Sequence, residues 1–85
     1  MQKQNRRIWT HQEIAAVVDY IKDEKPSLAT KMDEIERTIA DYRDTETANE
    51  LFRATSAVYP GMNSIDQSSL VMEVRLAWRR MLSLP

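Results

Sequence analysis

Paired carboxylates are the residues of this sequence whose types and spacing come closest to a catalytic arrangement. Asp33 and Glu36 lie three positions apart, and Glu46 and Glu50 lie four apart, so each pair shares one face of a helix. Two neighbouring carboxylates can divide the roles of general acid and general base when a pocket gives them different pKa values. Both pairs, however, fall on helix faces that the pattern predicts to be solvated, and we expect no catalytic role for them.

Other side chains with catalytic potential are few. His11 is the one histidine, Gly61 is the one glycine, and there is no cysteine. These counts exclude a thiol nucleophile, a His-Glu-x-x-His metal motif and a glycine-rich phosphate loop. His11 falls near the start of an expected helix, where an ordinary surface side chain is favoured over a pH-sensitive contact. We therefore predict no enzymatic activity, no metal or other cofactor, and no small-molecule substrate.

Basic side chains near the two ends of the chain could bind phosphate groups. They are Lys3, Arg6, Arg7, Arg75, Arg79 and Arg80. Between them, residues 10–66 hold six basic and twelve acidic side chains, which would repel phosphates unless they faced away. A helix–turn–helix interpretation places the turn at Pro60-Gly61 and the recognition helix directly after it. A DNA-binding transcriptional regulator is therefore the alternative function.

The start of the chain resembles a known DNA-binding family, the Myb/SANT-type domains. The run that resembles their first helix is Arg6-Arg7-Ile8-Trp9-Thr10, followed by Glu13-Ile14. The resemblance implies DNA binding by a small helical domain. It covers only the start of the chain, because the regularly spaced later tryptophans of that family are not matched, apart from Trp78 far downstream. The sequence does not assign the chain to that family.

Length and composition favour one small intracellular unit. With 85 residues and a net charge of −1, the chain has enough material for one modest core. We predict that residues 1–85 form a single helical domain in which residues 1–6 are flexible. No apolar run approaches the ~20 residues of a membrane span, and the N-terminus lacks the apolar segment of a signal peptide. We expect a cytoplasmic protein that does not bind membranes.

Apolar periodicity and helix-stop signals predict an all-α fold with four helices. The expected helices span residues 10–24, 27–42, 45–59 and 64–84. Thr10 and Glu13 have the spacing of a capping box at the start of the first helix. Ser64 and Gln67 have the same spacing, which predicts a cap at the start of the last helix.

The expected helices carry apolar stripes that predict a shared core. In the last helix the stripe is wide and comprises Leu70, Val71, Val74, Ala77, Trp78, Met81 and Leu82. Trp78 lies within this stripe, so we expect it in the core. Trp9 precedes the first helix and is expected to fold back onto the core as part of a hydrophobic staple, with an exposed binding anchor as the alternative.

The last helix also has a second, narrower apolar stripe on its opposite side. We call this set the outer stripe: Ile65, Met72 and Leu76. Either another part of the chain, such as residues 1–9, covers the outer stripe, or the outer stripe binds a partner, and the second interpretation is favoured. Arg75, Arg79 and Arg80 flank it and would add charged contacts at its edge, because arginine packs over apolar groups while its charge stays in water.

These observations predict a small helical binding module. Its partner would be another protein, or a second copy of the chain whose outer stripe pairs with itself. The effect of binding would be regulatory, as in an adaptor, an inhibitor or an assembly factor. A short, acidic, cysteine-free helical chain also suits a phage- or plasmid-type accessory protein that blocks a host complex.

Overall fold

Four α-helices form the part of the chain that the computed structural model describes, residues 7–38 and 45–83. They are α1 (His11–Glu24), α2 (Pro26–Thr38), α3 (Thr45–Val58) and α4 (Ser64–Ser83), and no β-strand occurs in these residues. The predicted all-α, four-helix fold is confirmed. Residues 1–6, which were predicted to be flexible, lie outside the described residues, as do residues 39–42 of the second expected helix and residue 84 of the fourth.

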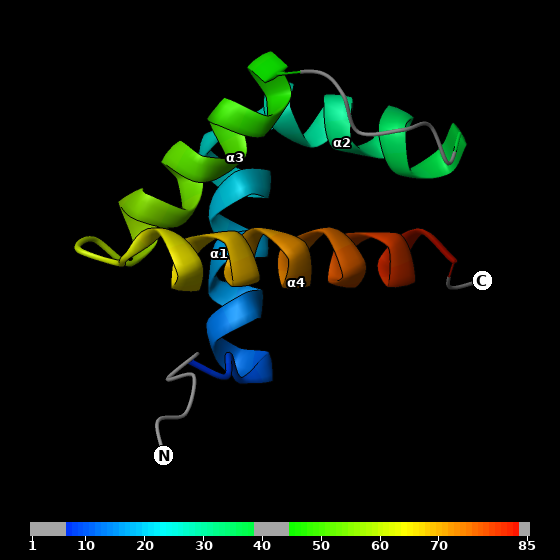
Figure 1. Ribbon diagram of the computed structural model, residues 1–85. Helices are drawn as coiled ribbons and strands as arrows, with labels where there is room; N and C mark the ends of the chain where they lie inside the picture. Colours follow the sequence, from blue (N-terminus) through cyan, green and yellow to red (C-terminus); the bar gives the residue numbers. More distant parts are fainter. Residues whose placement is uncertain (1–6, 39–44, 84–85) are drawn as a thin grey trace.

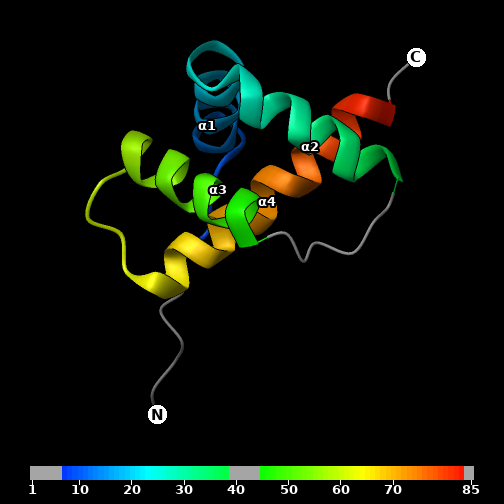
Figure 2. The same ribbon diagram turned by 90° about the horizontal axis from the view of Figure 1, so that it is seen from above.

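α4 crosses the molecule in contact with each of the other three helices (Figure 1). Seen from above, α2 crosses over α4, and α1 is viewed almost along its axis (Figure 2). The four helices share one buried core, to which α4 contributes the largest side chain, Trp78. The core members on the helices are Val17, Val18, Ile21, Leu28, Met32, Leu51, Ala54, Leu70, Val71, Val74 and Trp78.

Trp9 joins this core from outside the helices. Its indole N–H donates to the carbonyl oxygen of Asp66 at 3.2 Å, and its ring centroid lies 5.4 Å from that of Tyr59. The hydroxyl of Tyr59 in turn donates to the carbonyl oxygen of Glu13 at 3.2 Å. The segment before α1 is thereby fixed between the end of α3 and the start of α4. The prediction that Trp9 and Trp78 are core residues is confirmed.

Two short connections set the directions of the helices. Lys25 ends α1, donating its N–H to the carbonyl of Ile21, and its own carbonyl accepts the N–H of Ala29 in α2. Pro26 is the first residue of α2, where its fixed φ suits the helix and its missing N–H is not needed. Gly61 has a φ of +85°, a left-handed conformation that glycine adopts without strain, and it turns the chain from α3 into α4.

The cap at the start of α1 is the predicted one, but the cap at the start of α4 is not. Thr10 accepts the N–H of Glu13 at 3.1 Å, and the Glu13 carboxylate accepts the N–H of Thr10 at 2.9 Å, which completes the capping box. At the start of α4, the prediction that Ser64 is the cap is wrong. The side chain of Asn63 accepts the N–H of Asp66 at 2.8 Å instead.

Gln67 has a different role from the capping one predicted for it. Its side-chain amide donates to the carbonyl of Phe52 at 2.9 Å and to the hydroxyl of Ser56 at 2.6 Å. Both acceptors belong to α3, so Gln67 ties the first turn of α4 to α3. A hydrogen bond across helices therefore replaces the local one that the spacing suggested.

Glu13 should make the stability of the fold depend on pH. The backbone N–H of Thr10 holds the pKa of Glu13 below its usual value. Partial burial opposes this effect, and the guanidinium of Arg7 also lowers the pKa. Such a carboxyl group stabilises the fold above the unfolded-state pKa of about 4.3, and this contribution is lost as the pH falls through the lower folded-state pKa. We expect Glu13→Gln to be less stable than the parent near pH 7 and equal to it at the acid end. Thermal melts between pH 7 and pH 2.5 test this, and a constant difference across that range would contradict it.

Candidate functional site

The outer stripe of α4 lies on the surface of the described structure. Ile65, Met72 and Leu76 are 55%, 63% and 40% exposed, whereas Leu70 and Val74 on the opposite side of the helix are fully buried. Ile65 and Leu76 are eleven positions apart, so the outer stripe runs about 16 Å along α4. It therefore forms a straight apolar ridge about three helical turns long.

Residues 7–9 do not cover this ridge. Trp9 is buried against Tyr59, and Ile8 is itself 86% exposed. A hollow of about 350 Å³ lies beside the ridge instead, lined by Ser64, Ile65, Ser68, Ser69 and Met72. All five lining residues belong to the first half of α4, so the hollow is an open depression between Ile65 and Met72 on that helix.

A buried carboxylate lies on the other flank of α4. The side chain of Glu36 in α2 has no exposed area, and it accepts hydrogen bonds from Arg75 Nε at 3.1 Å and from Arg79 Nε and Nη2 at 3.1 and 2.9 Å. Asp33 is half-buried and accepts the indole N–H of Trp78 at 2.7 Å. The prediction that Asp33 and Glu36 lie on a solvated helix face is therefore wrong.

This burial of Glu36 follows from its position on α2. Glu36 lies one helical turn beyond Met32, at the edge of the apolar stripe, and α4 covers that edge. A buried carboxylate is tolerated only when opposite charges and hydrogen bonds replace its water. Arg75 and Arg79 provide both, so these two predicted edge residues also attach α2 to α4.

The remaining predicted basic residues do not gather into one patch. Arg7 pairs with Glu13, and its guanidinium lies 4.0 Å from the ring centroid of Trp9. Its backbone N–H binds Asp66 near the start of α4, which is about 20 Å along that helix from Arg79. Arg80 is exposed, and no ion pair of Arg80 occurs within the described residues. Lys3 and Arg6 lie outside those residues.

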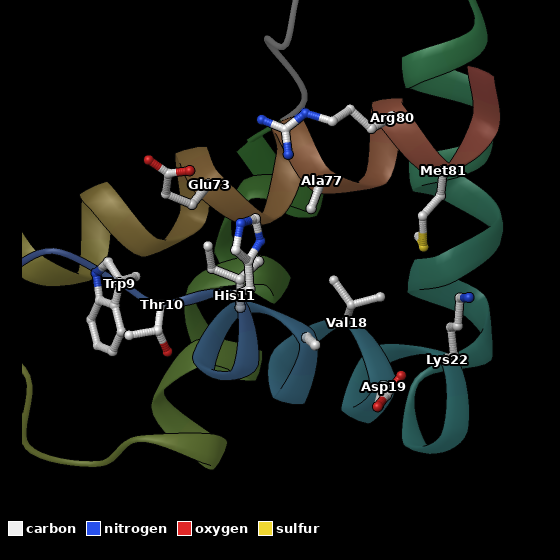
Figure 3. A pocket seen from close by; sticks show the side chains of 12 residues that line it. Trp9, Thr10, His11, Val18, Asp19, Lys22, Glu73, Ala77, Arg80 and Met81 are labelled. Atoms are coloured by element: carbon white, nitrogen blue, oxygen red, sulfur yellow. The ribbon is translucent and has the colours of Figure 1, made fainter. Parts of the chain in front are cut away.

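A groove of about 720 Å³ between α1 and α4 is the feature that the sequence did not predict (Figure 3). Its apolar lining comprises Ile14, Ala15, Val18, Ala77 and Met81, with Trp9 at one end. Charged side chains follow both of its edges: Asp19 and Lys22 on α1, Glu73 and Arg80 on α4. Each residue is an ordinary member of its own helix, and only the crossing of α1 over α4 brings them together.

The groove holds titratable side chains that do not act on one another in this structure. His11 extends from the start of α1 toward α4 (Figure 3). Within the described residues, no hydrogen bond or ion pair joins His11, Asp19 and Glu73. In residues 7–38 and 45–83, no group of three or more histidine, aspartate or glutamate side chains could hold a metal ion. The groove therefore offers an apolar surface with a charged edge.

The outer side of α4 is the candidate functional site. It combines the exposed outer stripe, the hollow beside it and, past Glu73 and Arg80, the groove shared with α1. No helix in the described part of the chain is both long enough and apolar enough to cross a membrane. No protein-family model, curated protein or solved structure matches the chain. The chemistry of these surface side chains is what supports a function.

Proposed function

We propose that this chain is a small helical module that binds another protein through the outer stripe of α4. The observation that carries the proposal is the alignment of Ile65, Met72 and Leu76 as exposed side chains on one helix face. The effect of binding would be regulatory, as in an adaptor or an inhibitor. A cytoplasmic accessory protein of phage or plasmid type, which blocks a host complex, belongs to the same proposal.

The arrangement of the outer stripe supports binding more strongly than exposure alone. Single exposed apolar residues are common on protein surfaces, but an aligned apolar ridge beside a hollow and a groove is typical of an interaction site. Met72 has a flexible thioether that adapts to irregular partner surfaces. Burying a fully exposed side chain of this size contributes about 1.5–3 kcal/mol. Because these three are 40–63% exposed, a partner that covers them gains roughly half of that for each.

Charge distribution gives less support to the DNA-binding alternative. Arg75 and Arg79 share the carboxylate of Glu36, and Arg7 pairs with Glu13. A DNA phosphate would have to compete with these carboxylates at Arg7, at Arg75 Nε and at Arg79 Nε and Nη2. Within the described residues, Arg79 Nη1 and Arg80 are open to a phosphate as much as to a carboxylate. The outer stripe would also contribute little to DNA binding, because affinity for a phosphate backbone comes mainly from charge and not from apolar contacts. Protein is therefore the better-supported partner.

A substitution in the outer stripe should separate binding from folding. We expect Leu76→Asp to change the free energy of unfolding by less than ~0.5 kcal/mol, as surface substitutions usually do. The same substitution should abolish partner binding, because the interface would bury an unpaired charge. Circular dichroism melts measure stability, the mass in solution detects self-association, and binding is measured with helical peptides selected against the parent protein.

Two further variants make this test specific. Asn49→Asp adds the same charge at an exposed position of α3 and should leave binding unchanged. Ala15→Arg places a long side chain in the groove and shows whether the groove takes part in binding. A large fall in the melting temperature of a monomeric Leu76→Asp protein would place Leu76 in the core and refute the proposal.

A further inference from the structure

We infer that the occupant of the outer stripe is an acidic amphipathic helix of a partner protein. The inference rests on the proposed function and specifies the chemistry of the partner. The apolar side chains of that helix would lie on Ile65, Met72 and Leu76. Its carboxylates would face Arg79 and Arg80, near the Leu76 end of the stripe.

The surface near the Leu76 end of the stripe carries positive charge because Glu36 is more deeply buried than its arginine partners. The Glu36 side chain is fully buried, whereas the side chains of Arg75 and Arg79 are 26% and 48% exposed. The negative charge of this cluster is therefore enclosed, and its positive groups face solvent. An approaching protein therefore meets these guanidinium groups on the α2 side of Leu76, while Glu73 and Arg80 lie on its α1 side.

Hydrogen-bond donors for a carboxylate remain available there. Arg79 uses Nε and Nη2 for Glu36, and its Nη1 makes no hydrogen bond within the described residues. The guanidinium of Arg80 likewise has no hydrogen-bond partner in that part of the chain. A free guanidinium edge binds carboxylates through charge-assisted hydrogen bonds, which are roughly twice as strong as neutral ones.

A second hollow extends this basic surface toward α2. It has a volume of about 440 Å³ and is lined by Glu36, Arg37, Arg79, Leu82 and Ser83. Arg37 is exposed in the last turn of α2, and no ion pair of Arg37 occurs in the described residues. Arg37 and Arg79 thus line this hollow together, and Arg80 lies one helical turn beyond Leu76 on α4.

The other end of the stripe, around Ile65, does not share this positive charge. There Asp66 accepts the backbone N–H of Arg7 at 3.2 Å, and the hollow beside Ile65 and Met72 is lined by serines. Among residues 7–38 and 45–83, no basic side chain lines that hollow. The complementary helix therefore carries its carboxylates at one end and an apolar side chain for the hollow at the other.

A helical partner matches the shape of the stripe. The three side chains span about 16 Å, which corresponds to about eleven residues of a helix laid along α4. Amphipathic helices present apolar residues at the i, i+4 and i+7 spacing that such a ridge requires. A nucleic acid would use the arginines but would leave the apolar ridge uncovered, so protein chemistry accounts for both features.

A charge-randomised peptide library provides the test. Displayed helical peptides carry a fixed apolar stripe, and each flanking position is Glu, Gln or Lys. Clones are selected against the full-length chain, and each clone is then measured on the parent, on Leu76→Asp and on Arg80→Gln. We expect enrichment of Glu over Lys at one end of the peptides, and binding that Leu76→Asp abolishes. Arg80→Gln should weaken binding about two- to fivefold, as expected for an exposed ion pair.

Charge reversal and a matched control sharpen the result. Arg80→Glu should prefer the Lys version of the same peptides, and added salt should weaken the binding of the Glu version to the parent. Arg53→Gln removes the same charge from an exposed site on α3 and should change nothing. Random duplex DNA is run in parallel at low salt.

Each outcome supports or overturns the inference. Enrichment of Glu together with dependence on Leu76 supports it. Binding that depends on Leu76 but favours Lys or Gln overturns the inference and leaves the proposed function standing. Clones that bind Leu76→Asp as well as the parent, or a selection without binders, overturn both. Retention on duplex DNA that Arg80→Gln abolishes favours the nucleic-acid interpretation and overturns the acidic helix.

Discussion

Replacing Trp78 with alanine is expected to lower the free energy of unfolding by about 3–5 kcal/mol. Trp78 is only 2% exposed and is the largest fully buried side chain of the core. Its removal leaves a cavity where α4 meets the other helices, and it also removes the N–H donor of the half-buried Asp33. Small domains have stabilities at the low end of the range of about 5–15 kcal/mol, so more than half of the total is at stake.

Urea denaturation followed by circular dichroism measures this loss. Trp78→Phe keeps most of the ring volume but removes the donor to Asp33, so it separates packing from the hydrogen bond. Met72→Ala on the same helix is the matched control, because Met72 is 63% exposed and its truncation should cost less than ~0.5 kcal/mol. A loss below ~1 kcal/mol for Trp78→Ala would show that this residue is not a core anchor.

The second large effect concerns the buried carboxylate. Replacing Arg75 and Arg79 together with methionine is expected to cost about 3–5 kcal/mol, because Glu36 would then be buried without an opposite charge. Glu36→Gln should cost less, since the two arginines are partly exposed and can turn toward water. The triple change Glu36→Leu, Arg75→Met and Arg79→Met should recover most of the loss, because it removes the charges as well as their partners.

The order of stability of these three variants tests whether Glu36 is a buried charge that depends on its two arginines. Urea denaturation of each, with Arg80→Met as the matched control, gives the four free energies of unfolding. Arg80 is exposed and has no ion pair within the described residues, so its substitution should be nearly neutral. A Glu36→Gln protein less stable than the double-arginine variant would contradict the burial argument.

Much of this fold could be predicted from local patterns. The helix positions followed from apolar spacing and from breakers such as Pro60-Gly61, because a helix buries one face and stops where its backbone cannot continue. The capping box of Thr10 and Glu13 depends only on residues three positions apart. The wide stripe around Trp78 was visible for the same reason, since one helix determines its own faces.

The features that were not predicted all depend on contacts between helices. Asn63 rather than Ser64 caps α4, and Gln67 makes hydrogen bonds with α3 instead of a local capping bond. Glu36 looked solvated because its partners, Arg75 and Arg79, come from a distant segment. Its place next to Met32, at the edge of an apolar stripe, was the one local signal of burial. The groove between α1 and α4 had no local signal, since it exists only where two helices cross.

The candidate site could be predicted in part, because one of its features is local to a single helix and another depends on contacts between helices. The sequence showed that Ile65, Met72 and Leu76 share one face, and the spacing of a single helix is enough to establish that. It left open whether another segment covers them, because coverage depends on how the whole chain packs. Their exposure in the structure came from that packing, as did the pairing of the flanking arginines with Glu36.

The position of α4 in the chain has a consequence for how the protein is made. α4 is the last of the four helices, yet it contacts every other helix and carries Trp78. Translation proceeds from the N-terminus, so α1, α2 and α3 leave the ribosome before the helix that completes their core exists. Their apolar faces are exposed during that interval, when nascent chains are prone to aggregate. The part of the core that Trp78 and its neighbours on α4 complete can therefore pack only after these residues have left the ribosome.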